Sequence, residues 1–268
     1  MINHQVALHI NRTTATIDTI WLAEQSHIAV TSLSLPYLQH ELILNQGDIF
    51  KVNDSSEKQR VIYSPLAPQC ITTKAYGRYQ ALGIMFQPIG IYATYGISAL
   101  DFVQSSNAVR LFDKATELDQ RFAEAAAPAD RLQVLISFFQ QNTVNKPCPP
   151  VVLHFLKVVS SLACQPVEIQ KIAKDLHFSA KHLIATFKSV VGITPHKYLQ
   201  LLQLNHALQR MIDCPGQKLT EIALEYGFYD QSHFIRVFKR YAGISPLKFR
   251  SQQAKQSHGF INTLIYKA

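Results

Sequence analysis

The sequence predicts an α+β chain of two domains, with an antiparallel β-rich domain first and an all-α domain second. Two observations predict this division. Short β-branched and aromatic runs separated by turn signals continue to about Phe86, and apolar residues at three- and four-residue spacing follow from about residue 90. A pattern that recurs after about fifty residues then fills the C-terminal half. The 268 residues are enough for two domains of ordinary size.

The first domain is expected to span residues 1–142 and to form a β-sandwich or small barrel followed by helices. Runs such as HELILNQGDIFKV, RVIYS and ALGIMF have the composition of strands. Helical spacing follows in residues 91–104, 116–126 and 129–142. The last of these contains the apolar stripe LQVLISFF, which we take as the candidate surface for a homodimer.

Residues 143–150, TVNKPCPP, are the expected linker because they are proline-rich, polar and without apolar periodicity. The second domain then spans residues 151–268. It opens with the helical run VVLHFLKVVSSLA, and a long helix is expected to start at Thr194-Pro195, a cap followed by proline. The tail at 251–268 contains FINTLIY, which fits either a strand or a loose end.

The clearest local pattern lies between Leu219 and Arg250. A short amphipathic helix ends at Gly227, where a tight turn needs a positive φ, and Asp230 is a good N-cap for a second helix. Gly243 ends that second helix. A helix, a glycine-containing turn and a helix with a polar and basic face form the helix-turn-helix pattern, whose second helix enters the DNA major groove.

The same pattern occurs once before. IAKDLHF at residues 172–178 aligns with IALEYGF at residues 222–228, fifty positions later. Tyr229 is an extra residue, so the offset after it is fifty-one. The aligned pairs beyond it include Ser179 with Asp230, Phe187 with Phe238, and Gly192 with Gly243. Repetition of caps, core phenylalanines and terminal glycines predicts one supersecondary unit that is used twice.

Charge is distributed unevenly between the two halves. Residues 150–268 hold 15 Lys and Arg against 6 Asp and Glu, a net +9, whereas residues 1–149 hold 11 against 12, a net −1. A basic C-terminal half beside a nearly neutral half is typical of a nucleic-acid-binding domain attached to another domain. Charge alone is weak support, because many basic proteins bind no specific nucleic acid, and it gains weight here from the repeated motif.

These segments, IALEYGF, DQSHFIRVFKRYAGISP and IAKDLHFSAKHLIATFKSVVGITPHKYL, resemble the DNA-binding domain of the AraC/XylS family of bacterial transcription regulators. The resemblance covers roughly residues 150–250. It implies two helix-turn-helix units joined by a linker helix, double-stranded DNA as partner, and sequence-specific regulation of transcription. HELILNQGDIFKV and LGIMFQPIGIYATYGIS also resemble the cupin-like N-terminal domain of a subgroup, which implies a small-molecule effector or a homodimer.

Alignment with the family places certain residues of the second helix toward DNA bases, namely Gln231, Ser232, Ile235 and Arg236. Gln pairs with adenine and Arg with guanine, although Arg236 is equally suited to a phosphate contact. Phosphate contacts are expected from Lys239 and Arg240. The corresponding positions of the first helix are Lys181, Ile184, Ala185 and Lys188. We expect the first unit to supply affinity, shape or thymine-methyl contact and the second to supply hydrogen-bonded base recognition.

Other functions receive less support from the residues. His40-Glu41 is the nearest approach to a cupin metal site, but adjacent residues of a strand face opposite sides, so neither a metal nor a cofactor is expected. Cys70 would be the nucleophile of a DNA-targeted enzyme of the cupin or alkyl-repair type, yet no basic neighbour lowers its pKa. An effector-independent DNA-binding protein is the other alternative.

The N-terminus lacks the pattern of a signal peptide, and no apolar run approaches the ~20 residues that cross a bilayer. The four cysteines are scattered without a C-x-x-C pair, as expected for reduced thiols. The prediction is therefore a cytoplasmic DNA-binding regulator that is not an enzyme and has no membrane partner.

Overall fold

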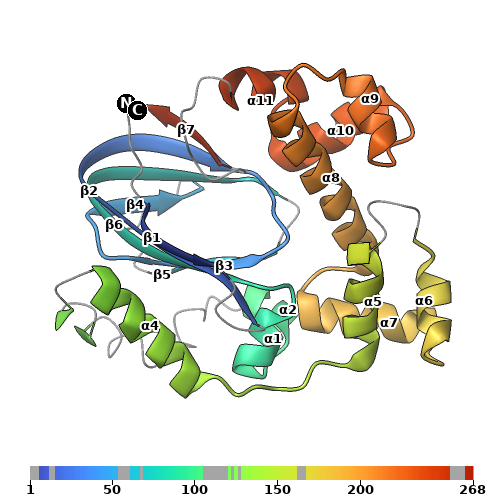
Figure 1. Ribbon diagram of the computed structural model, residues 1–268, viewed down its shortest axis with the longest axis horizontal. Coiled ribbons are helices and arrows are strands. Elements are labelled where there is room, and N and C mark those ends of the chain that lie inside the picture. The colour runs from blue at the N-terminus through green and yellow to red at the C-terminus, as the bar shows by residue number, and fades with distance from the viewer. Residues whose placement is uncertain are drawn as a thin grey trace.

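The structure is a computed structural model in which an antiparallel sheet with helices packed on it occupies one side and a group of helices the other (Figure 1). This arrangement confirms the predicted α+β fold. The described residues are 6–11, 16–53, 61–66, 69–104, 120–121, 124–125, 128–161, 167–253 and 263–267. The helix expected at 116–126 lies largely outside them.

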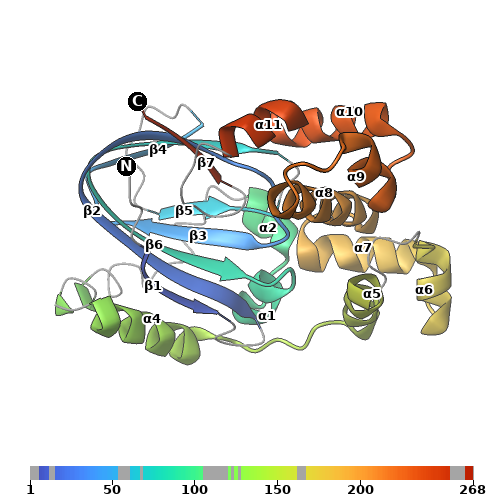
Figure 2. The same cartoon turned by 45° about the horizontal axis from the view of Figure 1, so that its top comes forward.

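The described strands all pair antiparallel in one sheet, of order β1-β2-β6-β3-β5, with β4 on β6 and β7 on β2. Their bounds are β1 Val6–Asn11, β2 Ile17–Ser34, β3 His40–Asn45, β4 Ile49–Val52, β5 Val61–Ser64, β6 Ile71–Phe86 and β7 Thr263–Lys267. The two longest strands, β2 and β6, pair from Ile17↔Phe86 to Ser34↔Ile71 and curve together (Figure 2).

Alternation along β2 gives the sheet two apolar faces. Ile20 and Leu22 belong to one buried cluster, while Trp21 and Ala23 belong to another on the opposite face. Gly83 of β6 is the partner of Trp21 in the register, and a Cβ atom there would come within 1.9 Å of the indole ring. The strand therefore needs glycine at this position so that the ring can lie flat on the backbone.

Helix α4, Pro128–Asn142, packs along the first of these faces, which α1, Gly90–Tyr95, and α2, Ala99–Gln104, also help to cover (Figures 1 and 2). Leu135, Phe138 and Phe139 of α4 are buried in the same cluster as the sheet residues. The stripe LQVLISFF was our candidate dimer surface, and this assignment is wrong for these three side chains. They stabilise the chain's own core instead.

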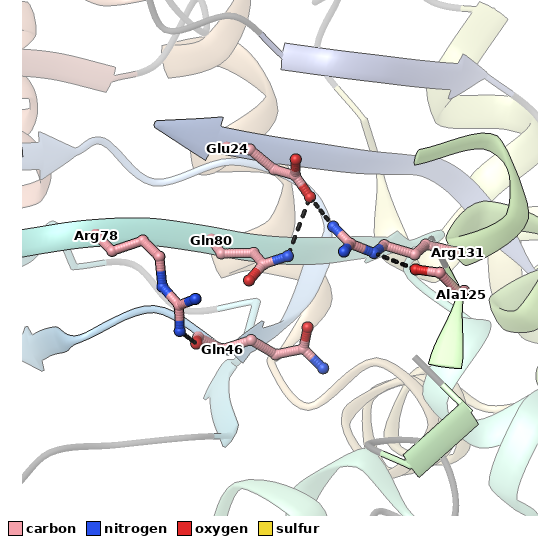
Figure 3. Close-up of polar contacts among 6 residues, drawn as sticks. All are labelled: Glu24, Gln46, Arg78, Gln80, Ala125 and Arg131. Carbon is pink, nitrogen blue, oxygen red and sulfur yellow. Dashed lines mark hydrogen bonds and ion pairs between the residues drawn. The ribbon is translucent and has the colours of Figure 1, made fainter. Parts of the chain in front are cut away.

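Polar contacts fix the same helix to the sheet (Figure 3). The Arg131 guanidinium of α4 forms an ion pair with Glu24 of β2, and its Nε donates to the carbonyl oxygen of Ala125 at 3.0 Å. The Glu24 carboxylate also accepts from Nε2 of Gln80 across the strand pair at 3.1 Å. These groups are only partly buried, so they orient α4 while the apolar contacts supply most of its stability.

The helical domain consists of α5 to α11. Their bounds are α5 Pro150–Ser161, α6 Ile169–Asp175, α7 Ala180–Val191, α8 Pro195–Asp213, α9 Leu219–Glu225, α10 Gln231–Ala242 and α11 Pro246–Gln253. Helix α8 runs from the α6–α7 unit to the α9–α10 unit, as the predicted linker helix (Figure 1). Its buried residues Leu201, Leu204 and Leu208 belong to one core with residues of both units.

The C-terminal tail returns to the sheet. Strand β7 pairs with the second half of β2, from Val30↔Lys267 to Ser34↔Thr263, beyond the stretch that β1 covers. From the sequence, this segment fitted either a strand or a loose end, and we placed it in the helical domain. Pairing with β2 is favourable because it satisfies backbone N–H and C=O groups that an uncovered strand edge would expose.

The sheet domain and the helical domain share an apolar core. Leu35 and Leu66 of the sheet domain are buried in the same cluster as the core of the helical domain. Hydrogen bonds that cross the junction include those from Ser98 Oγ to the Ser189 carbonyl oxygen at 3.0 Å and from Asn205 Nδ2 to the Pro36 carbonyl oxygen at 3.2 Å. The first reaches the C-terminal end of α7, so the sheet domain is in direct contact with a predicted recognition helix.

Candidate nucleic-acid interface

The first helix-turn-helix unit is formed by α6 and α7. His177 takes a positive φ of 59° in the turn, the conformation that its alignment with Gly227 requires, and histidine adopts it more readily than a β-branched residue would. The Ser179 side chain accepts a hydrogen bond from the His182 N–H at 3.1 Å, which caps α7. Gly192 ends the helix at φ 88°.

The second unit, formed by α9 and α10, repeats these features. Gly227 has φ 77°, Asp230 accepts from the His233 N–H at 2.6 Å, and Gly243 ends α10 at φ 69°. His233 is also held locally, because its Nδ1 accepts from the Tyr229 N–H at 3.3 Å. The predicted caps and terminal glycines are therefore confirmed in both units.

Equivalent phenylalanines anchor the two recognition helices. Phe187 of α7 packs edge-on against Phe155 of α5, with ring centroids 4.8 Å apart, and Phe238 of α10 packs against Phe234 and Phe249. All five rings are buried. Because each helix is fixed along its apolar side, the opposite side is left as a rigid surface for contact.

That outer surface of α7 contains the residues that we predicted. Lys181, Ala185 and Lys188 are exposed, and Ile184 is 39% exposed despite being a large apolar side chain. The face therefore combines two cations with two apolar groups. Such a combination suits phosphate attraction together with contact to thymine methyl groups.

The outer surface of α10 is more polar. Ser232, Arg236, Lys239 and Arg240 are exposed, whereas Gln231 and Ile235 are half-buried. The Thr220 hydroxyl of α9 donates to Gln231 Oε1 at 2.6 Å, which fixes the orientation of this amide before any ligand arrives. Its Nε2 is directed away from that bond and retains two N–H donors for a base acceptor.

Two exposed aromatic residues near the helix starts were missed by our sequence analysis. Tyr229, directly before the cap of α10, is 87% exposed, and Phe178, directly before the cap of α7, is 38% exposed and stacks on His182 with ring centroids 4.6 Å apart. An exposed ring beside a basic helix can pack against a deoxyribose, and the Tyr229 hydroxyl can donate a hydrogen bond to a phosphate. Tyr229 could have been recognised, since it is the extra residue that separates the two repeats.

His40 lies where the sheet domain meets the end of α7. It is fully buried, its Nδ1 accepts from the Leu66 N–H at 3.1 Å, and Tyr63 Oη is 2.7 Å from the same atom. Burial lowers the pKa of His40 to about 4, although the nearby carbonyl groups of Pro88 and Val191 favour the charged form. His40 is therefore a buried, hydrogen-bonded residue and not a surface histidine.

No group of three or more His, Cys, Asp or Glu residues suited to a metal ion occurs among the described residues. In the same part of the chain, no helix is both long and apolar enough to cross a membrane. Cys70, Cys148 and Cys214 are free thiols, and Cys70 lies beside Gly243, where a Cβ atom would come within 3.2 Å of its sulfur.

Comparison with known proteins gives the same assignment for the helical domain. Residues 172–252 match the family described as "Helix-turn-helix domain". The melibiose operon regulatory protein of Escherichia coli is 26% identical over 44% of this chain and 39% of its own length. The transcriptional regulator MtrA of Neisseria gonorrhoeae is 32% identical over 37% of this chain and 33% of its own length. This chain thus spans about two fifths or less of these relatives.

Solved structures are also similar. A transcriptional regulator from Chromobacterium violaceum with an AraC-type DNA-binding domain is 26% identical, covers 40% of this chain and 96% of its own, and has a TM-score of 0.37. The structure of ToxT from Vibrio cholerae with a bound unsaturated fatty acid is 11% identical, covers 93% of this chain and 100% of its own, and has a TM-score of 0.49. The duplicated, capped units and the family match agree that residues 172–252 of this chain form a helix-turn-helix domain.

Proposed function

We propose that this protein is a sequence-specific DNA-binding transcription regulator whose sheet domain responds to a small-molecule effector. The observation that carries the proposal is the pair of capped helices, α7 and α10, each fixed by a buried aromatic core and each with a polar or basic outer face. A rigid helix with this kind of face is the element that helix-turn-helix proteins place in the major groove. The protein acts by binding and catalyses no reaction.

The linker helix sets the spacing between the two units. Its 19 residues span about 28 Å at the usual rise per residue. Successive major grooves on one side of DNA are roughly 34 Å apart, so a helix of this length suits two recognition helices in adjacent grooves. One chain would then contact a non-palindromic site of ~15–20 bp.

The two faces support different roles. Arg236 and Gln231 of α10 have the donors for hydrogen bonds to base edges, whereas Lys181 and Lys188 of α7 supply charge beside the apolar Ile184. Replacing Arg236 with alanine should therefore relax the preference at one or two base pairs. Replacing Lys181 with alanine should weaken binding to every sequence by a similar factor.

The test compares affinities for a selected site and for single-base variants of that site, by fluorescence anisotropy of labelled duplexes. Lys51→Ala is the matched control. It also removes one positive charge, but from β4 of the sheet domain, which belongs to neither helix-turn-helix unit. Equal weakening at all sites by Arg236→Ala and Lys181→Ala would contradict the assignment. A Cys70→Ser variant that binds DNA normally but loses regulation would favour the enzymatic alternative.

A further inference from the structure

The first residue of α10, Gln231, is held by a residue of the preceding helix. The Thr220 hydroxyl of α9 donates to Gln231 Oε1 at 2.6 Å. This separation is typical of two oxygens, whereas an amide nitrogen usually lies about 2.9–3.0 Å from an oxygen acceptor. The carbonyl end of the amide is therefore the end that faces α9. Thr220 is exposed and Gln231 is half-buried, so the pair lies at the surface where α9 meets α10.

The other end of the amide offers hydrogen-bond donors. Gln231 Nε2 has no hydrogen bond within the described part of the chain, and it carries two N–H groups without accepting any hydrogen bond. Oε1 keeps a second lone pair, but the direction of this oxygen is set by Thr220 before DNA arrives. A base that meets Gln231 in this orientation therefore meets the amide nitrogen first.

The two purines present different groups to such a nitrogen. Guanine has two acceptors in the major groove, N7 and O6, and a single nitrogen with more than one N–H can donate to both, as lysine does. Adenine has its N6–H₂ donor beside N7, so one donor would face another. A glutamine that pairs with adenine must turn Oε1 and Nε2 to the base together. That rotation competes with the bond that Thr220 makes to Oε1.

We propose that Thr220 orients Gln231 to recognise guanine in preference to adenine, an inference that rests on the proposed function. Thr220 is then a positioning residue, because it acts on the base through the amide of Gln231. Glutamine by itself is expected to pair with adenine, so the neighbouring hydroxyl reverses the preference that the side-chain type suggests.

The first helix-turn-helix unit lacks this arrangement. The residues aligned with Thr220 and Gln231 are Gln170 and Ala180. Ala180 has no polar side-chain group, so α7 has no amide to orient at its first position. Among the two units, the orienting pair thus belongs to the second, to which we assign the hydrogen-bonded recognition of bases.

The experiment measures the affinity of the full-length protein for a selected DNA site and for its single-base variants, by fluorescence anisotropy. Gln231→Met removes the donors and keeps the side-chain length, so the base pair at which it loses discrimination is the one that Gln231 contacts. At that base pair the wild type should bind guanine about fivefold or more tightly than adenine. Thr220→Val keeps the shape of the side chain without the hydroxyl and should lower this ratio about three- to tenfold.

Two further variants separate orientation of the amide from general stability. Thr220→Ser retains the hydroxyl and should keep the wild-type ratio. Thr31→Val makes the same change on β2 and is the matched control. All of these side chains are uncharged, so non-specific binding to random duplex DNA should stay unaltered. If Thr220 only stabilised α9, Thr220→Val would weaken binding to every sequence by one factor and leave the ratio of guanine to adenine unchanged.

The outcomes distinguish this inference from the proposed function. A wild-type preference for adenine at this base pair overturns the inference, as does a ratio that Thr220→Val leaves unchanged. Gln231→Met with wild-type discrimination at every base pair also overturns it, because Gln231 then recognises no base. In these cases the protein still binds a specific site, and the proposed function stands. A protein that selects no site from random DNA overturns the proposed function and the inference with it.

Discussion

Acid should weaken the junction between the two domains through one side chain, His40. In the unfolded chain this histidine has an ordinary pKa of 6.5, while burial lowers it to about 4 in the folded protein. The backbone N–H of Leu66 donates to Nδ1, so the native ring is neutral and a proton at Nδ1 would face another donor. Protonation therefore requires the junction to open.

The sign and size of the effect follow from these two values. Below pH 6.5 the unfolded chain binds a proton that the folded protein excludes, so stability falls as the pH falls, until the folded pKa of about 4 is reached. A difference of about 2.5 pKa units corresponds to about 3 kcal/mol in the free energy of unfolding. About 1.4 kcal/mol of this should be lost by pH 5.5.

Urea unfolding of the wild type and of His40→Gln between pH 7 and pH 4 measures the effect. Glutamine stays neutral over this range, so the wild type should lose about 3 kcal/mol more than the variant by pH 4. Glu41, whose pKa is raised by burial, titrates in both proteins and cancels in the comparison. Parallel curves for the two proteins would refute the assignment of a buried, neutral His40.

Three further changes test the fold. Asp230→Ala should lower the free energy of unfolding by about 1 kcal/mol and weaken DNA binding, because the cap of α10 is lost, and Asp230→Asn should restore both. Gly83→Ala should cost about 1–3 kcal/mol and shift the fluorescence of Trp21, the chain's single tryptophan, to longer wavelength. Deletion of residues 254–268 should accelerate hydrogen exchange of the amides at 30–34, since β7 no longer covers this edge.

Each of these three predictions has a result that would contradict it. For the cap, an alanine variant as stable as the wild type would show that Asp230 is dispensable. For Gly83, unchanged fluorescence would mean that the indole does not lie on this strand. For the deletion, amides in the stretch of β2 paired with β1 are the control, and uniform acceleration along β2 would indicate general destabilisation instead of a lost strand.

Local signals account for most of what the sequence predicted. The second helix of each repeated unit begins at a side-chain cap and ends at a glycine, and both signals act within a few residues, so Ser179, Asp230, Gly192 and Gly243 could be assigned from the sequence. The exposed faces of α7 and α10 followed from the same helical periodicity. These features need no knowledge of where the rest of the chain lies.

Features that depend on distant segments could not be predicted in this way. The stripe of α4 has the periodicity of any amphipathic helix, and only the three-dimensional structure shows that Leu135 and Phe139 pack on the chain's own sheet. Strand β7 and the burial of His40 both require a partner that is remote in sequence. A pocket between the sheet domain and the helical domain likewise combines Gln39 and Gln87 with Ser160, three residues that no local pattern connects.

The most direct test of the central claim is selection of binding sites from random duplex DNA by the full-length protein, at about 150 mM salt to suppress non-specific phosphate attraction. Two recognition helices on one chain predict an asymmetric motif with two conserved blocks about 10 bp apart. A single block, or no enrichment from either the full-length protein or residues 150–268 alone, would contradict the claim that both helices recognise DNA sequence.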